Sequence, residues 1–212
     1  MAGEFKLTWR VSDGILMDEE RYAEMMNLLT RHEDVADEIA FFLAEPSSGA
    51  YDPLENVAEK AEVFKKRAKE IRAMGKSVGI NVWPSFGKGE AYSISEMRPE
   101  VPFRRMVGMD GTVDAGLVCP VSPEFLDYIH QKYVILAKAE PEFIWVDDDA
   151  RMTDLGGVPY PCFCDDCVKN FENGRFSSRE ELVEELNKKE NRELRHSWSS
   201  YGGDRLARFC AE

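Results

Sequence analysis

Short apolar runs alternate with longer stretches of helical periodicity along the first two thirds of the chain. Four runs have the length and composition of β-strands, at 5–12, 38–44, 77–83 and 142–147. Three stretches between them place apolar residues three and four positions apart, at 19–31, 53–74 and 123–139. The pattern therefore predicts a strand–helix unit that occurs four times.

The stretch 53–74 is the clearest predicted helix. Pro53 stands at its start, and Gly75 follows its last residue, which is the usual placement of these residues at helix ends. Its apolar positions form one stripe, made of Val57, Ala61, Phe64, Ala68 and Ile71. We expect this stripe to be buried against the strands.

Two regions depart from the strand–helix alternation. Residues 84–121 are rich in glycine and proline and are expected to be irregular, and a loop of this length is usually functional. Residues 165–211 are expected to be mostly helical, and Ser178 with Glu181 forms a capping-box pattern at the start of one helix.

Strands that are apolar throughout, such as IAFFL and FIWV, are typical of a parallel sheet in an α/β fold. A doubly wound dinucleotide-binding sheet would carry a glycine-rich turn after its first strand, but only Asp13-Gly14 follows Ser12. Polar and aromatic residues at strand ends favour a (βα)8 barrel, which needs about 250 residues. We therefore expect residues 1–212 to form a single α/β domain that is the first half of a larger TIM-barrel-like protein.

The composition is that of a globular protein, with 43% hydrophobic and 32% charged residues. The net charge of −13 and the lack of a basic patch argue against nucleic acid and anionic membranes as partners. No apolar run approaches the roughly 18–20 residues of a membrane span. No secretion signal is visible in the first ten residues, so we expect a cytoplasmic location.

Three of the five cysteines lie within six residues, as Cys162-Phe163-Cys164-Asp165-Asp166-Cys167. Closely spaced thiolates repel one another, and a zinc ion resolves this by binding all of them. A structural zinc site needs a fourth ligand, and Cys119 is the best candidate because its loop should reach the same end of the sheet. Free thiols, one disulfide, or an iron–sulfur cluster are the alternatives.

Three acids, Asp147, Asp148 and Asp149, follow the strand FIWV directly. Three neighbouring carboxyls cannot all ionise cheaply, so one should keep its proton, as a general acid in glycoside hydrolysis must. We expect them at the carboxyl end of a central parallel strand, in a cleft shared with Arg10 and Trp83. The alternative is an acidic loop that binds a cation or caps a helix.

Other residues at the predicted strand ends have two interpretations each. Arg10 could line the pocket or pair with a structural acid, and Trp83 could stack on a sugar or pack in the core. Trp145 is expected in the core.

The four cysteines together with VCPVSPEFLDYI and FIWVDDDARM resemble the barrel of family-42 β-galactosidases and of related bacterial glycoside hydrolases. The resemblance implies bacterial origin, a carbohydrate substrate and a structural zinc held by Cys119, Cys162, Cys164 and Cys167. By position, Asp149 stands where the family has its acid/base Glu, and Asp148 where it has an Asn that binds a sugar hydroxyl. The family's nucleophilic Glu lies on a later strand, so this chain should be inactive without the rest of the barrel.

Three functional hypotheses follow from the sequence. The first is a glycoside hydrolase segment, the second a non-catalytic zinc-stapled module that binds carbohydrate or protein, and the third a cation-dependent hydrolase. Because a half-barrel has two open sheet edges, we expect either a homodimer that closes the barrel or a helix from 178–210 that covers the open side.

Overall fold

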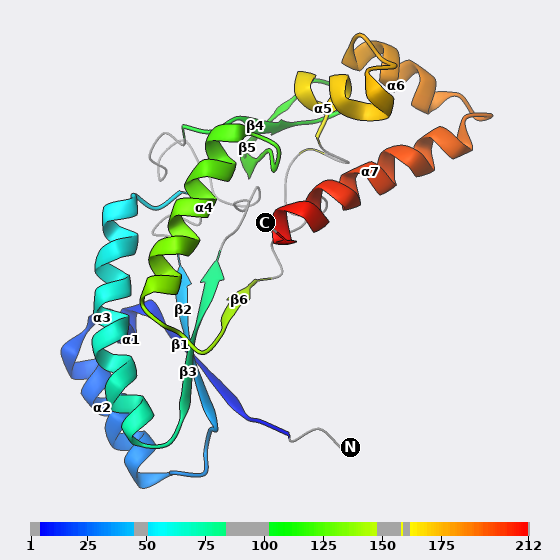
Figure 1. The fold of residues 1–212 in the computed structure, drawn as a ribbon. Helices are drawn as coiled ribbons and strands as arrows, with labels where there is room; N and C mark the ends of the chain where they lie inside the picture. Colours follow the sequence, from blue (N-terminus) through cyan, green and yellow to red (C-terminus); the bar gives the residue numbers. More distant parts are fainter. Residues whose placement is uncertain (1–4, 45–50, 84–101, 148–157, 159–161, 212) are drawn as a thin grey trace. The chain divides into compact units, whose positions relative to one another are not determined.

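The computed structural model of the chain describes residues 5–44, 51–83, 102–147, 158 and 162–211. These residues fall into two compact units (Figure 1). The first, called here the sheet unit, comprises Met1–Pro46, Asp52–Trp83 and His130–Asp147. The second, called the cysteine unit, comprises Ser47–Tyr51, Pro84–Ile129 and Asp148–Glu212. A single domain over residues 1–212 stays a prediction.

The sheet unit has the predicted α/β architecture. Its four-stranded parallel sheet has the order β1 (Thr8–Ser12), β2 (Glu38–Ala44), β3 (Ser77–Trp83) and β6 (Ile144–Val146). Its helices are α1 (Asp13–Met17), α2 (Glu19–Arg31), α3 (Leu54–Ala73) and the end of α4 (Pro123–Lys138). The predicted strands and helices of this unit are confirmed, and α1 is an addition where only a turn was expected.

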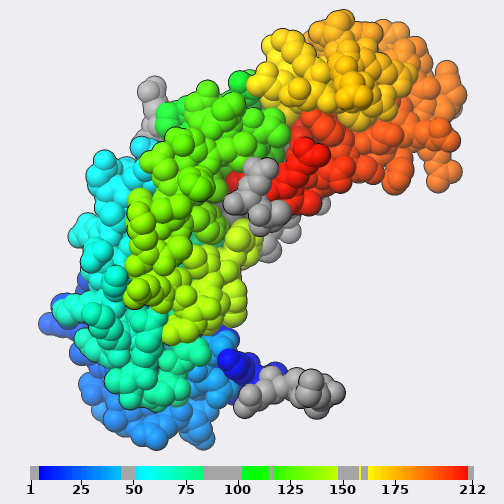
Figure 2. Space-filling view, viewed as in Figure 1, coloured from blue at the N-terminus to red at the C-terminus, as the bar shows by residue number. Residues whose placement is uncertain are grey.

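One face of the sheet packs against the helices and forms the core. Its buried side chains are Val11, Ile39, Phe41, Leu43, Val78, Ile80 and Val82. The predicted stripe of α3 is buried against them, and the rings of Phe41 and Phe64 meet edge to face with centroids 6.0 Å apart. Each large apolar side chain buried in this way contributes about 1.5–3 kcal/mol. Figure 2 shows α3 (cyan) and the second half of α4 (lime green) as a continuous surface over this unit.

The opposite face of the sheet carries a mixture of aromatic and polar side chains. The parallel register pairs Arg10 with Ala40 and Phe42 with Asn81, so these residues share one face, and Trp83 follows two positions after Asn81. Figure 1 shows α2, α3 and the end of α4 on the other side of the four strands. Among the described residues, the helices of this unit therefore leave the face of Arg10 and Trp83 uncovered.

Strand β6 lies at the edge of the described sheet, which corrects the expectation of a central strand. Trp145 and Val146 are each 41% exposed, so Trp145 is not in the core as predicted. The reason is that β6 pairs only with β3, over three residues. The ring of Phe143, just before β6, occupies the space above Gly79, where a Cβ atom would approach it to 2.3 Å.

The cysteine unit combines a small antiparallel sheet with helices. Strands β4 (Arg105–Val107) and β5 (Val113–Val118) pair within a region that was expected to be irregular, which corrects that prediction. The helices that follow are α5 (Asp165–Asn170), the 3-10 turn η1 (Phe171–Asn173), α6 (Arg179–Asn187) and α7 (Arg192–Ala211). The predicted cap is confirmed, because Ser178 accepts a hydrogen bond from the Glu181 N–H at 3.1 Å.

Aromatic side chains from η1, α7 and the loops before α5 and α6 form the core beside the cysteines. Trp198 of α7 contacts Phe163 and Phe171, with ring centroids 4.8 and 5.0 Å away. Phe171 also stacks on Phe176 and contacts Tyr201. The described part of the chain contains no helix with the length and hydrophobicity that crossing a membrane requires.

Candidate metal centre and strand-end cluster

The four cysteines are brought together by two segments that flank strand β4. Cys119 follows β5 directly, and its N–H donates to the Arg104 carbonyl at 2.9 Å. On the other segment, the Phe163 N–H donates to the Val107 carbonyl at 2.7 Å. Cys164 is the N-cap residue of α5, and its extended backbone turns the chain into the helix. These backbone bonds hold both segments against the same short strand.

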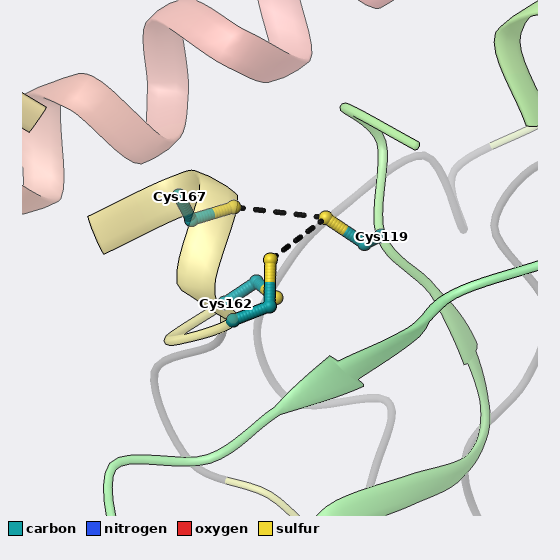
Figure 3. A group of neighbouring side chains, drawn as sticks. Cys119, Cys162 and Cys167 are labelled. Atoms are coloured by element: carbon teal, nitrogen blue, oxygen red, sulfur yellow. Dashed lines mark hydrogen bonds between the residues drawn. The ribbon is translucent and has the colours of Figure 1, made fainter. Parts of the chain in front are cut away.

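The sulfur atoms are close enough to hold a metal ion. All four Sγ atoms lie within 4.8 Å of one another, and all four residues are buried. Cys119 Sγ is 3.7 Å from Cys164 Sγ and 3.6 Å from Cys167 Sγ, and Figure 3 shows it pointing toward the α5 turn. A tetrahedral ion with metal–sulfur bonds of about 2.3 Å spaces its ligands about 3.8 Å apart. The group therefore fits a single ion.

The alternatives for the cysteines can be compared with this geometry. The four thiols are free, so none of them forms a disulfide. A 4Fe–4S cluster binds each thiolate to a different iron atom, and a 2Fe–2S cluster divides the thiolates between its two iron atoms, so either cluster would spread the sulfurs more widely than one ion does. The described arrangement thus fits one ion better than a cluster, and Cys119 lies close enough to the other three thiols to be the fourth ligand.

The four thiols perturb one another because they share hydrogen bonds in a buried space. The bonds to neighbouring thiols raise the pKa of Cys119 and Cys167 and lower the pKa of Cys162 and Cys164. Two thiols thus retain protons that a bound cation would displace. The Val107 N–H donates to Cys162 Sγ at 3.4 Å, which is how backbone groups commonly support thiolate ligands.

Three of the predicted strand-end residues meet in the sheet unit. Arg10 Nη2 donates to Asp147 Oδ2 at 2.6 Å, and the guanidinium lies 3.8 Å from the centroid of the Phe42 ring. Phe42 in turn contacts Trp83, with ring centroids 5.7 Å apart. We call these four residues the strand-end cluster. Trp83 ends β3 and Asp147 directly follows β6, as the sequence predicted, whereas Arg10 and Phe42 lie inside β1 and β2, two residues before the carboxyl end of each strand.

The remaining site predictions are either untested by the described residues or changed by the structure. Asp148 and Asp149 lie outside the described residues, so their places stay predictions. Arg10 pairs with an acid, as the alternative interpretation held, but that acid is Asp147 of the predicted site itself. Phe42 was missed, although strand alternation opposite the buried Phe41 could have placed it on the open face.

A second charged group near the carboxyl end of β1 was also missed. Asp52 is buried and accepts hydrogen bonds from Asn56 and from Lys60 Nζ, each at 2.9 Å. Lys60 Nζ also lies 3.8 Å from a carboxylate oxygen of Asp13. These contacts fasten the beginning of α3 near the end of β1, and a structural role accounts for them.

No protein-family model matches this chain, and no curated protein is similar to it in sequence. By its fold and its site, the chain is an α/β protein with a parallel four-stranded sheet and a four-cysteine candidate metal centre. What it does has to be inferred from these residues.

Proposed function

We propose that the chain is the zinc-stapled first half of a barrel-type glycoside hydrolase, with its carbohydrate site at the carboxyl ends of the parallel strands. The observation that carries the proposal is the strand-end cluster. A sugar presents a C–H face that stacks on aromatic rings, and hydroxyls that bond to carboxylate and guanidinium groups. Arg10, Trp83 and Asp147 supply these groups in one place.

The one-sided cover of the sheet supports a barrel over a doubly wound sheet. A doubly wound sheet carries helices on both faces, whereas a barrel strand turns one face toward helices and the other toward the barrel interior. In the part of the chain that is described, α2 and α3 cover a single face. The uncovered face with Trp83 and Phe42 would line the interior.

The ion pair of Asp147 indicates that the three acids have different roles. Asp147 is engaged with Arg10, which suits it to orient a sugar hydroxyl. We assign proton transfer to Asp149, and contact with the sugar to Asp148, from the positions they take in the family resemblance. Hydrolysis needs a second carboxyl across the bond. We place that group on a strand that pairs with an edge of the sheet, from a second copy of the chain or from a further segment.

The four cysteines are proposed to hold a structural zinc ion. Four protein ligands leave no open position for a water or a substrate, which separates structural from catalytic zinc sites. When bound, zinc supplies positive charge that compensates the four thiolates, and it joins the two cysteine-bearing segments rigidly. The role of this chain's own residues is to hold the loop after β5 against the start of α5.

Sugar binding can be tested on the protein by its tryptophan fluorescence, titrated with a panel of monosaccharides and disaccharides. We expect one sugar to change the emission, and Trp83→Ala and Arg10→Met each to weaken binding at least about tenfold. The control is Arg31→Met, which removes an exposed arginine at the end of α2. A panel without any response would contradict the proposal.

The Arg10–Asp147 pair also favours a second candidate, a module that binds carbohydrate without cleaving it, because this ion pair occupies the described carboxylate of the cluster. Turnover of aryl glycosides separates the two functions. Cleavage that is lost in Asp149→Asn supports the hydrolase. Sugar binding with no cleavage by any assembly of the chain supports the binding module.

A further inference from the structure

We propose that Arg104 is a positioning residue of the metal centre, which braces the turn that carries Cys164 and slows the loss of metal. This inference rests on the proposed binding of a metal ion by the four cysteines. It concerns a side chain outside the cysteine motif, which nothing in the spacing of the cysteines indicates.

Arg104 contacts both of the segments that carry ligands. Its backbone carbonyl accepts the N–H of Cys119 at 2.9 Å, which fixes the loop after β5. Its guanidinium forms an ion pair with Asp166 in the first turn of α5, and it interacts by charge and hydrogen bonding with the side chain of Cys164. One residue thus joins the single ligand of one segment to the ligand turn of the other.

The charge of Arg104 has the sign that the site requires. A divalent ion with four thiolates carries a net charge of −2, which is costly to bury without a neighbouring cation. Val107 offers only the dipole of its N–H to Cys162, whereas Arg104 brings a full positive charge to Cys164. A charge-assisted contact of this kind is roughly twice as strong as a neutral one.

Cys164 is also the ligand at which metal loss should begin. It is 5% exposed, whereas Cys119, Cys162 and Cys167 are 0% exposed. Among the described residues, Cys164 is therefore the most accessible of the four cysteines to a chelator or an oxidant. The interaction of Arg104 with Cys164 and the exposure of Cys164 therefore both indicate that Arg104 slows metal loss at this ligand.

The test compares zinc-loaded wild type with Arg104→Met and Arg104→Lys, by following zinc release to a colorimetric chelator. Outer partners of metal ligands typically change affinity by about 10–100-fold, so we expect Arg104→Met to release zinc at least about tenfold faster. Arg104→Lys should fall between the two because it keeps the charge. The matched control is Arg175→Met, which breaks an exposed arginine–glutamate pair of the same unit and should not change the rate.

Cobalt supplies a readout that a merely structural role would not move. In the cobalt-loaded protein, Arg104→Met should shift the thiolate-to-cobalt charge-transfer band, while Arg175→Met should leave it in place. If Arg104→Met does not fold, Arg104→Gln removes the charge with a smaller loss of hydrogen bonding and takes its place in both assays.

The outcomes distinguish this inference from the proposed function. If wild-type protein takes up no zinc or cobalt, the metal centre itself is wrong. If wild type holds the metal and Arg104→Met releases it at the wild-type rate with an unchanged cobalt band, the metal centre stands and the role of Arg104 is overturned.

Discussion

At the scale of single residues, Cys164 connects the metal to the stability of the fold. It is a candidate ligand at the N-cap position of α5, where its side chain makes no capping hydrogen bond, so its replacement by serine acts through the ion. Because the binding energy of a structural metal is folding energy, Cys164→Ser should lower the free energy of unfolding by several kcal/mol. Thermal unfolding measures this, with Arg175→Met, at an exposed position of the same unit, as the control. Equal midpoints for both variants would contradict a structural role.

Gly79 gives a second prediction at this scale. A Cβ atom there would lie 2.3 Å from the Phe143 ring, so Gly79→Ala must displace that ring or β6. We expect a loss of about 1–3 kcal/mol, the usual cost of overpacking. Gly203→Ala is the control, because an added Cβ there would meet nothing within 4 Å outside the adjoining backbone of α7, and alanine should be neutral or stabilising. Chemical denaturation of the two variants would show whether the Phe143 contact exists.

At the scale of elements, Glu142 fastens β6 to β3. Its backbone N–H donates to the Val78 carbonyl, its carboxylate accepts the Val78 N–H, and Arg72 Nε donates to it at 2.6 Å. Burial raises the pKa of Glu142, but the bonds from Arg72 and Val78 outweigh burial and bring the pKa below its ordinary value of 4.5. The stability from this carboxylate is therefore present above pH 4.5 and is lost as the pH falls through the lowered pKa.

Glu142→Gln tests this attachment of β6. We expect it to destabilise the protein by about 1 kcal/mol at pH 7, since solvent screens so exposed a pair. The difference from wild type should disappear once the pH falls below the lowered pKa. Glu59→Gln, on the exposed side of α3, should be neutral throughout. If the variant stayed less stable than wild type below the lowered pKa, Glu142 would act through its packing and not through its charge.

The sequence predicts a helix or strand well where the apolar positions within that segment repeat with a clear period. The helix 19–31 and the strands 38–44 and 77–83 have the predicted bounds, because their apolar positions repeat with a clear period. Strands β4 and β5 were missed because they are short and lie among glycines and polar residues. Their pairing depends on long-range contacts that no local pattern records.

The candidate sites differ in the same way, since a motif within one segment can be predicted from sequence and a contact between distant segments cannot. The spacing of Cys162, Cys164 and Cys167 predicted a metal centre, since closely spaced thiols have few other uses. The contact of Arg104 with Asp166 spans 62 positions, and that of Arg10 with Asp147 spans 137, so neither is visible as a motif. The exposure of Trp145 was missed for a related reason, because an apolar segment does not reveal whether its strand lies at an edge.

At the scale of the whole molecule, the two edge strands point to association. Among the described residues, β1 and β6 each have a single strand neighbour, and apolar side chains are exposed beside them, at Leu7, Trp145 and Val146. Unpaired strand edges tend to recruit further strands. We expect light scattering to show a dimer that Val146→Lys weakens, with Val35→Lys, at an exposed position between α2 and β2, as control. A monomer at all concentrations would contradict the open half-barrel.

The metal content of the purified protein tests the central claim most directly. Elemental analysis of the wild type, prepared without added metal or chelator, should give one zinc per chain. The variant that combines Cys119→Ser with Cys164→Ser should contain none, because it removes one ligand from each of the two segments that meet at the centre. Wild-type protein without bound metal, or a double variant that retains its zinc, would contradict the account.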